Sequence, residues 1–454
     1  MRALLAALAI VAAAAPAAAQ PMDTYGMGSR SIALGGAVTA DVEDFSANFY
    51  NPAGAVRSET LHFGIGWFWA EHDLSINDRD SNVDPVSGVV AGLNVPGNIG
   101  DFRFAFSLGL HLNDQRVSRT RTLPRMRPRW ELYDNRQHRT FLAAHVAIEP
   151  VPWLRVGGGI GFLSFSEVDL RIRGELSLAS PERESRLESD LLANLVTIRF
   201  PQAGVQVQPL PWLNFGAVYR GEYVLTSELF AQVGEPDGDG PLATSIRAGS
   251  IDVPTYLRLL SASTGAYVPH QISFGASVEP IPEVLRIGVE VTWLMWSLYQ
   301  SPIGRTELDL EIDVPPELAG TITVPPLADT FPAPANFSDR WVPRIGVEVT
   351  PLRDDVLALD LRAGYFYENS PAPEQTNEFN LVDTDRHAWS VGVGVEFFSL
   401  RPFLPGSLTL DVHFQYAFMP SRLNRKLSPI DPTGDYVARG NIFVGGFTLG
   451  LQFE

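Results

Sequence analysis

The sequence predicts an all-β membrane protein, a 14-stranded antiparallel transmembrane β-barrel with an N-terminal hatch in its lumen. Three observations predict this fold. From about Leu61 onward, apolar and polar residues alternate with period two. Short Pro-rich turns alternate with long polar loops, and a Gly-rich stretch without any period precedes the first strand. A closed barrel is the only sheet that a bilayer permits, because a free edge would leave backbone groups unpaired in hydrocarbon.

The composition fits a lipid-facing surface and excludes several other classes. Of the 454 residues, 45% are hydrophobic and 19% are charged, which is a low charged fraction for a soluble protein. A net charge of −18 leaves no basic stripe that could bind nucleic acid. The chain has no cysteine, and its 8 histidines lack the spacing of a zinc site, so we expect no metal and no cofactor.

The first 19 residues are typical of a secretory signal peptide. Arg2 supplies a minimal basic region, an apolar run extends from Leu4 to Ala15, and Ala17–Ala19 form a cleavage site. The alternative is a membrane anchor, for which the apolar run is short. We therefore expect a signal peptide at 1–19, a hatch at 20–58 and a barrel at 59–454, located in the outer membrane of a Gram-negative bacterium.

The predicted strands have one apolar face and one polar face. Along 408–418, Leu410, Val412 and Phe414 share one face, whereas Asp411 and His413 share the other. A soluble sandwich would also alternate, but here the polar face is rich in Gly, Ser, Thr and charges, as a wet lumen is. Aromatic residues gather near strand ends, for example in the WLMWSLY run at 293–299. The predicted strands are 61–70, 84–94, 101–112, 139–149, 154–170, 190–208, 213–230, 266–279, 284–299, 341–350, 355–367, 386–399, 407–418 and 440–453.

The connections between these strands are of two kinds. Tight turns with proline follow Glu149, Gln208, Glu279 and Thr350. Long polar loops are predicted at 113–138, 231–265, 301–340 and 421–438. Short turns at one end and long loops at the other are typical of outer-membrane barrels, whose turns face the periplasm.

The N-terminal stretch resembles the hatch of the FadL/TodX family of outer-membrane transporters for hydrophobic compounds. The resemblance rests on Gly28-Ser29-Arg30, Leu34-Gly35-Gly36-Ala37 and Asn51-Pro52-Ala53-Gly54, and it continues in Leu361–Tyr365 and Asp383–His387. It implies a monomeric barrel that is plugged by its own N-terminus. The residues that it assigns to the hatch or gate are Gly28, Gly35, Gly36, Asn51, Pro52 and Ala53.

The resemblance implies passive uptake of long-chain fatty acids or aromatic hydrocarbons, with capture among extracellular loops and release when the hatch shifts. The alternative is a FadL-like barrel that acts as a scaffold or shuttle for secreted proteins, since such barrels share the hatch motif. A hydrophilic porin is a third reading, which the hatch disfavours. The expected partners are hydrophobic small molecules, outer-membrane lipid and lipopolysaccharide, and the outer-membrane assembly machinery. An inward kink in the third strand opens a side window in some family members, but residues 101–112 alternate regularly here.

Charged residues on the predicted lumen face should pair across strands, because isolated charges in a barrel would be costly. They are Arg155, Arg286, Glu290, Arg344, Glu348, Asp360, Arg362, Glu396 and Asp411. Alternatively, one of these arginines binds a substrate carboxylate. Candidate pocket residues near strand ends and in loops are Trp130, Tyr133, Tyr256, Leu259, Leu260, Trp296 and Phe331. No Ser-centred motif such as GxSxG occurs, so we predict no catalytic residue and no enzyme activity.

Overall fold

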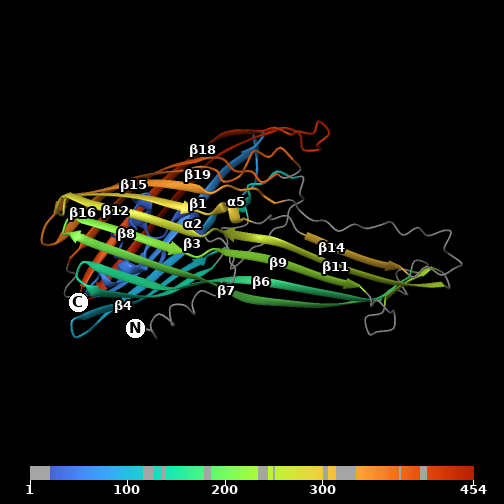
Figure 1. The fold of residues 1–454 in the computed structure, drawn as a ribbon, viewed down its shortest axis with the longest axis horizontal. Helices are drawn as coiled ribbons and strands as arrows, with labels where there is room; N and C mark the ends of the chain where they lie inside the picture. Colours follow the sequence, from blue (N-terminus) through green and yellow to red (C-terminus); the bar gives the residue numbers. More distant parts are fainter. Residues whose placement is uncertain are drawn as a thin grey trace.

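The structure is a computed structural model that describes residues 21–115, 127–134, 140–177, 186–233, 244–248, 251–299, 305–312, 334–377, 380–398 and 406–453. The predicted signal peptide lies outside these residues. The described strands form one sheet, which closes where β1 (Leu61–Ile76) pairs with β19 (Tyr436–Phe453). Fourteen antiparallel strands form this closed wall, so the predicted fold class is confirmed. Figure 1 shows the wall from the side, with helix α2 (Pro21–Tyr25) within it.

Each wall strand pairs with the next one along the chain. Between β1 and β19, the wall strands are β3 (Val86–Ile99), β4 (Phe102–Asn113), β5 (Phe141–Val151), β6 (Leu154–Ser177), β7 (Arg186–Leu210), β8 (Leu213–Arg220), β12 (Gln271–Ile281), β13 (Leu285–Leu294), β15 (Arg340–Arg353), β16 (Leu357–Glu368), β17 (Arg386–Phe397) and β18 (Gly406–Asn424). β4 keeps one register with both neighbours over 103–111, as its regular alternation predicts.

Some segments that were expected to be loops contain strands. Beyond the wall strands, the chain forms β2 (Arg79–Asp80), β9 (Tyr223–Val233), β10 (Thr244–Ala248), β11 (Ile251–Val268) and β14 (Arg305–Ile312). The loops predicted at 231–265 and 301–340 are therefore partly wrong. The predicted strand 266–279 is also divided, because β11 and β12 are separated at Pro269, which has no N–H to donate to a ladder.

Short turns join the wall strands at one end of the barrel, which we call the turn end, and long connections lie at the other, the loop end. Four turns follow a shift in strand register, and each shift contains a proline of the predicted turn motifs: Pro150, Pro209, Pro280 and Pro351. The missing N–H of proline explains a bulge there. At the last of these sites β15 continues to Arg353, so the turn lies beyond the predicted Thr350–Pro351.

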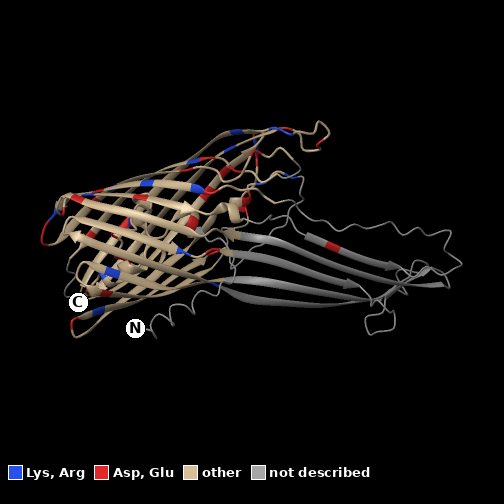
Figure 2. Ribbon diagram, viewed as in Figure 1, with Lys and Arg blue, Asp and Glu red and all other residues tan. Residues whose placement is uncertain are grey.

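The two faces of the wall differ as the alternation predicts. Leu410, Val412 and Phe414 are exposed on the outside, whereas Asp411 and His413 are buried on the inside. Figure 2 shows long stretches of the wall strands without any charge. The WLMWSLY run is only partly an outer aromatic band: β13 ends at Leu294, and the following turn of 3-10 helix η3 (Trp296–Leu298) leaves Trp296 buried.

The described helices are short, and none is long and apolar enough to cross a membrane. Besides α2 and η3 they are α3 (Ser29–Ala33), α4 (Ala47–Tyr50), η2 (Pro52–Val56) and α5 (Glu131–Asp134). Four of them belong to the N-terminal segment, Pro21–Val56, which packs inside the wall.

Candidate functional site

The N-terminal segment is enclosed by the wall and bound to it through its backbone. Met27, Val42 and Ala53 have no exposed surface. Wall side chains donate hydrogen bonds to backbone carbonyls of the segment: Gln202 Nε2 to Phe49 at 2.9 Å, and Arg386 Nη1 to Thr24 at 3.1 Å. The segment is thus held inside the wall by groups that belong to the wall strands.

Glycines on the lumen face give the segment room to lie against the wall. A Cβ at Gly204 would lie 2.0 Å from Asn51 Oδ1, and a Cβ at Gly364 would lie 2.2 Å from the Gly35 nitrogen. Any side chain at these positions would displace the segment. The glycine content of the lumen face is therefore explained by close packing and not only by a wet interior.

Asn51 connects three parts of the plug. Its Nδ2 donates to the carbonyl oxygens of Thr39 at 2.8 Å and Val205 at 3.0 Å. Its Oδ1 accepts from the backbone nitrogen of Ala53 at 3.1 Å and thereby caps η2, whose first residue is Pro52. Only an amide offers two donors and an acceptor in this arrangement, which accounts for the Asn-Pro-Ala sequence.

The glycines of the predicted hatch have positive φ angles. Gly28, Gly35 and Gly36 have φ of +78°, +64° and +76°. The last two reverse the chain after α3, and the Gly35 carbonyl accepts a hydrogen bond from Arg344 Nη1 at 3.0 Å. A residue with a side chain would be strained there.

Glu348 is the centre of the predicted charge network. Arg30 of α3 binds its carboxylate through Nε and Nη2, both at 2.9 Å. Arg286 and Arg362 bind the same carboxylate at 3.3 and 2.5 Å. Arg362 also pairs with Asp411, and its Nη2 lies 2.8 Å from Asp360 Oδ2. The network thus includes Arg30, a residue of the segment that the sequence analysis did not count among the lumen charges.

The other predicted lumen charges have separate partners. Arg155 pairs with Glu149 at 2.8 Å. Glu290 accepts from the backbone nitrogen of Thr39 at 3.0 Å. Glu396 lines a cavity at the turn end. The structure therefore brings Arg286, Glu348, Asp360, Arg362 and Asp411 together in ion pairs, and Glu396 lines the same cavity, whereas Arg155, Glu290 and Arg344 lie elsewhere.

Two cavities lie on opposite sides of the segment. The first, which we call the vestibule, is at the turn end and has a volume of about 580 Å³. Arg30, Glu43 and Phe45 of the segment line it, and nine carboxylates face four arginines among its described lining residues. It is therefore a polar and predominantly acidic compartment.

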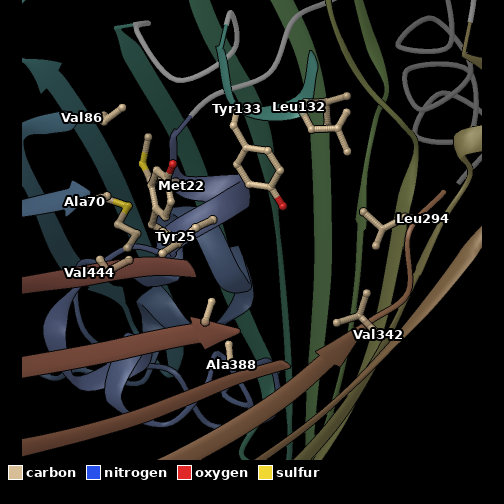
Figure 3. Close-up of a cluster of buried hydrophobic side chains, with 14 of the residues drawn as sticks. Met22, Tyr25, Ala70, Val86, Leu132, Tyr133, Leu294, Val342, Ala388 and Val444 are labelled. Carbon is tan, nitrogen blue, oxygen red and sulfur yellow. The ribbon is translucent and has the colours of Figure 1, made fainter. Parts of the chain in front are cut away.

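The second cavity, which we call the inner cavity, is smaller and lies toward the loop end. Its volume is about 100 Å³, and Tyr25, Thr39 and Tyr50 of the segment line it. Figure 3 shows Met22 and Tyr25 of the segment near Tyr133 of α5, with Leu294 beyond them. Aromatic rings and charged side chains therefore share the lining of this cavity.

Four arginines also line the inner cavity, and each lies over an aromatic ring. Arg220 stacks on Phe49 at 4.0 Å from its centroid, Arg344 and Arg386 on Phe366, and Arg340 on Trp296. Of these arginines, the sequence analysis named Arg344 alone. Arg220, Arg340 and Arg386 stand at the loop ends of β8, β15 and β17, where alternation alone does not say which side chains turn inward.

The candidate pocket residues have different locations. Tyr133 and Trp296 are buried and line the inner cavity. Trp130 is buried but lines a different cavity of about 520 Å³ at the loop end, where its Nε1 donates to Ser81 Oγ at 3.1 Å. Tyr256, Leu259 and Leu260 belong to β11, and their side chains lie outside the described part of the chain, as does Phe331.

Asp383, at the loop end, has a shifted pKa. Burial raises the pKa of Asp383 to about 6, and the nearby Arg340 guanidinium opposes this shift. Asp383 is 4% exposed and lies in the connection between β16 and β17. Its carboxyl group therefore changes charge near neutral pH.

Comparison of the sequence with known protein families gives one match. A family model described as outer membrane protein transport protein (OMPP1/FadL/TodX) matches residues 183–450, more than half of the chain. The chain belongs to the FadL/TodX family. A search of curated proteins gave no match.

Solved structures of FadL/TodX proteins share this fold across almost the whole chain. A Pseudomonas aeruginosa FadL homologue is 15% identical with a TM-score of 0.54, covering 94% of this chain and 97% of its own. The CymD monoaromatic hydrocarbon channel is 15% identical with a TM-score of 0.52, covering 94% and 98%. The P. putida toluene transporter TodX is 13% identical with a TM-score of 0.52, covering 95% and 99%.

Membership of the FadL/TodX family decides the class of function. The family consists of outer-membrane transport proteins and not of enzymes, as the absence of a nucleophile motif predicts. This member is therefore an outer-membrane transporter of hydrophobic compounds.

Proposed function

We propose that this FadL/TodX protein takes up long-chain fatty acids or aromatic hydrocarbons passively, and that the N-terminal segment is the gate. The observation that carries the proposal is the place of that segment between the inner cavity and the vestibule. Tyr25 and Tyr50 line the inner cavity, whereas Arg30 and Glu43 line the vestibule. A ligand in the inner cavity can reach the turn end only when the segment moves.

The driving force in this proposal is partition and not an energy source. Burial of apolar surface stabilises a ligand by about 0.8 kcal/mol per methylene, so the aromatic side chains that line the inner cavity would attract the apolar part of a ligand from water. The loop end would face the outside of the cell and the turn end the periplasm, with downhill flow between them. This direction agrees with long connections at one end and short turns at the other.

The segment is suited to act as a gate because many small contacts hold it. Its bonds to the wall include the Arg30–Glu348 pair, the Arg344–Gly35 bond and the Ser29–Thr448 contact. Single neutral hydrogen bonds contribute about 0.5–1.5 kcal/mol each, and bonds to charged groups, such as those between Arg30 and Glu348, about 1.5–3 kcal/mol. Local release of the segment then costs much less than opening the wall, in which every strand pairs on both sides.

The expected membrane partners follow from the outer surface. Stacked aromatic rings mark the wall near the loop end, including Trp293 on Trp341 at 5.5 Å and Trp389 on Tyr416 at 6.1 Å. Such rings favour the boundary between hydrocarbon and headgroups. We propose outer-membrane lipid and lipopolysaccharide as their neighbours, a monomeric barrel, and insertion by the outer-membrane assembly machinery.

A disulfide tests whether the segment must move. Ser29 Oγ lies 3.0 Å from Thr448 Oγ1, and the chain has no cysteine of its own. The S29C/T448C variant should form a disulfide that fixes α3 to β19. Oxidised protein should lose uptake of radiolabelled oleate and toluene in cells without another transporter, and reduction should restore it.

The matched control places a disulfide within the wall. Val289 and Ile345 face each other across β13 and β15 and point to the outside, so V289C/I345C should not affect uptake in either redox state. Uptake by oxidised S29C/T448C at the wild-type rate would contradict the gate. Absence of saturable uptake by the wild type, together with a secreted protein that co-purifies, would favour the scaffold function instead.

A further inference from the structure

We propose that helix α5 is a second gate, which closes the inner cavity toward the loop end while the N-terminal segment closes it toward the turn end. This proposal rests on the gated uptake proposed above, because a second gate has a role only where a ligand passes through the lumen. A hydrophobic molecule then passes two barriers in succession, one on each side of the inner cavity.

Three cavities follow one another along the lumen. The cavity of about 520 Å³ at the loop end, which Trp130 lines, is called the outer cavity below. Strand β1 runs past all three cavities: His62 lines the vestibule, and Ile76 at the loop end of the same strand lines the outer cavity. Between them on β1, His72 contacts Tyr25, which lines the inner cavity. The inner cavity therefore lies between the vestibule and the outer cavity.

Helix α5 lies between the inner cavity and the outer cavity. Its residues Leu132 and Tyr133 line the inner cavity, whereas Asp134 and the adjacent Trp130 line the outer cavity. Figure 3 shows the ring of Tyr133 extending from α5 toward Tyr25 of the N-terminal segment. All of these α5 side chains and Trp130 are at most 7% exposed, so the helix is packed tightly where it separates the two cavities.

His72 of the wall lies between the two gates. Its Nδ1 lies 2.9 Å from the Asp84 carbonyl oxygen and donates to it, so its Nε2 accepts from the Tyr25 hydroxyl at 2.5 Å. The centroid of its ring is also 6.2 Å from that of Tyr133, a normal distance for an aromatic pair. One wall residue thus contacts an aromatic ring from each gate, and the inner cavity is closed on both sides of this contact.

Two connections between strands anchor α5. The Arg129 backbone pairs with the connection between β16 and β17: its N–H donates to the Asn380 carbonyl at 3.0 Å, and its carbonyl accepts from the Val382 nitrogen at 2.8 Å. The Trp130 indole donates to Ser81 Oγ at 3.1 Å, in the connection that follows β2. Neither anchor belongs to a wall strand, so α5 can leave them without breaking the pairing of the wall.

A disulfide across the first anchor tests whether α5 must move. Arg129 and Leu381 are partners in an isolated parallel bridge, so their Cα atoms lie about 4.8 Å apart, within the range of a disulfide. Oxidised R129C/L381C should lose uptake of radiolabelled oleate and toluene in cells without another transporter, and reduction should restore it. Uptake by the oxidised variant at the wild-type rate would overturn the second gate.

Labelling of a thiol in the inner cavity shows from which end the cavity opens. Leu294 lines this cavity and is 8% exposed, and the chain has no cysteine of its own. In purified full-length L294C, the rate of reaction with N-ethylmaleimide at position 294 follows the open population, and mass spectrometry of that peptide measures it.

The two locks should affect this labelling rate differently. Oxidation of R129C/L381C/L294C should slow it at least about tenfold, because the closed form is then the only one populated at α5. Oxidation of S29C/T448C/L294C should leave it unchanged, because α5 still opens. The wall control V289C/I345C/L294C should label like L294C in both redox states. An unchanged rate after oxidation of R129C/L381C/L294C would overturn the proposal.

A point substitution should act in the opposite direction. Ser81→Ala removes the acceptor of the Trp130 indole N–H and should raise the labelling rate of L294C about tenfold, the effect of one hydrogen bond to a buried group. Ser75→Ala, which removes a bond from β1 to the Arg439 carbonyl, should not change it. Loss of folding would accelerate labelling in every variant, so it cannot produce both the slowing by the disulfide and the acceleration by Ser81→Ala.

The outcomes separate the two gates. If oxidised R129C/L381C transports normally while oxidised S29C/T448C does not, α5 is not a gate and the uptake gated by the N-terminal segment remains. If oxidised R129C/L381C blocks uptake while oxidised S29C/T448C does not, α5 is a gate and the proposal for the N-terminal segment fails. If the wild type takes up neither oleate nor toluene, the transport proposal fails, and the labelling rates at position 294 still decide whether α5 closes the cavity.

Discussion

Replacement of Asn51 by alanine should release the N-terminal segment without disturbing the wall. Asn51 is fully buried, and its amide binds the Thr39 and Val205 carbonyls and the Ala53 nitrogen. Its bond to Val205 is one of those that connect the segment to the wall. Val205 itself keeps its strand neighbours in β6 and β8 when the side chain is removed.

The size of the effect follows from three lost hydrogen bonds. Each contributes about 1 kcal/mol at a buried site. Local unfolding of the segment breaks the two bonds within it as well as the bond to Val205, so Asn51→Ala should make this opening about 3 kcal/mol easier. Since about 1.4 kcal/mol corresponds to a factor of ten, the open population should rise about a hundredfold. Van der Waals contacts of the lost side chain would add to this change.

The absence of native cysteine allows a direct measurement. Ser46→Cys places one thiol at a buried position in the segment. When reclosing is faster than labelling, the rate of maleimide labelling follows the open population. The rate in S46C/N51A should exceed that in S46C by about a hundredfold, whereas S46C/N98A, which changes an exposed asparagine of β3, should label like S46C. An increase below about fivefold, in protein that still shows the mobility of a folded barrel, would refute the role of Asn51.

Two further predictions concern packing and pH. Gly364→Ala should displace the segment and raise the same labelling rate, because the new Cβ would lie 2.2 Å from the Gly35 nitrogen, while Gly445→Ala, with its nearest atom at 3.9 Å, should not. Burial raises the pKa of Asp383 to about 6, so this carboxyl group binds a proton more tightly in the folded protein than in the unfolded protein. The stability of the loop end should therefore fall as pH rises through about 6. Asp383→Asn should abolish that slope in protease resistance between about pH 4 and 7; an unchanged slope would contradict the assignment.

The wall could be predicted from sequence because each strand has an apolar environment on one face and a polar environment on the other. Lipid outside and polar groups inside impose period two, as in Leu410, Asp411 and Val412, and the strand count follows from that alternation. Prediction failed where this constraint ends. β11 occupies part of the region expected to be a loop, and Trp296 is buried after β13 has ended.

The partners of the segment could not be predicted from any local pattern. Arg30 and Glu348 are far apart in sequence, and nothing around Arg30 indicates that α3 meets β15. The same holds for Gly204 and Asn51, whose contact depends on how the plug is oriented. Sequence periodicity assigns a residue to one face of a strand, but it does not tell which residue of the irregular N-terminal segment that residue contacts.

The lumen charges show how one spacing can serve two compartments. In β13, Arg286 and Glu290 are four residues apart, and in the antiparallel neighbour β15, Arg344 and Glu348 have the same spacing. The register sets Arg286 opposite Glu348 and Glu290 opposite Arg344. The first pair lines the vestibule and the second lines the inner cavity.

The segment between these two pairs decides their different roles. At the vestibule, Arg30 joins the pair of Arg286 and Glu348, so a residue of the N-terminal segment completes the ionic cluster. At the inner cavity, the segment offers Arg344 only the neutral carbonyl of Gly35, so the carboxylate that faces Arg344 comes from the wall residue Glu290. Because the wall residues are complementary in both places, the difference between the two ends comes from the N-terminal segment, which adds a cation at one end of the lumen and only a neutral carbonyl at the other.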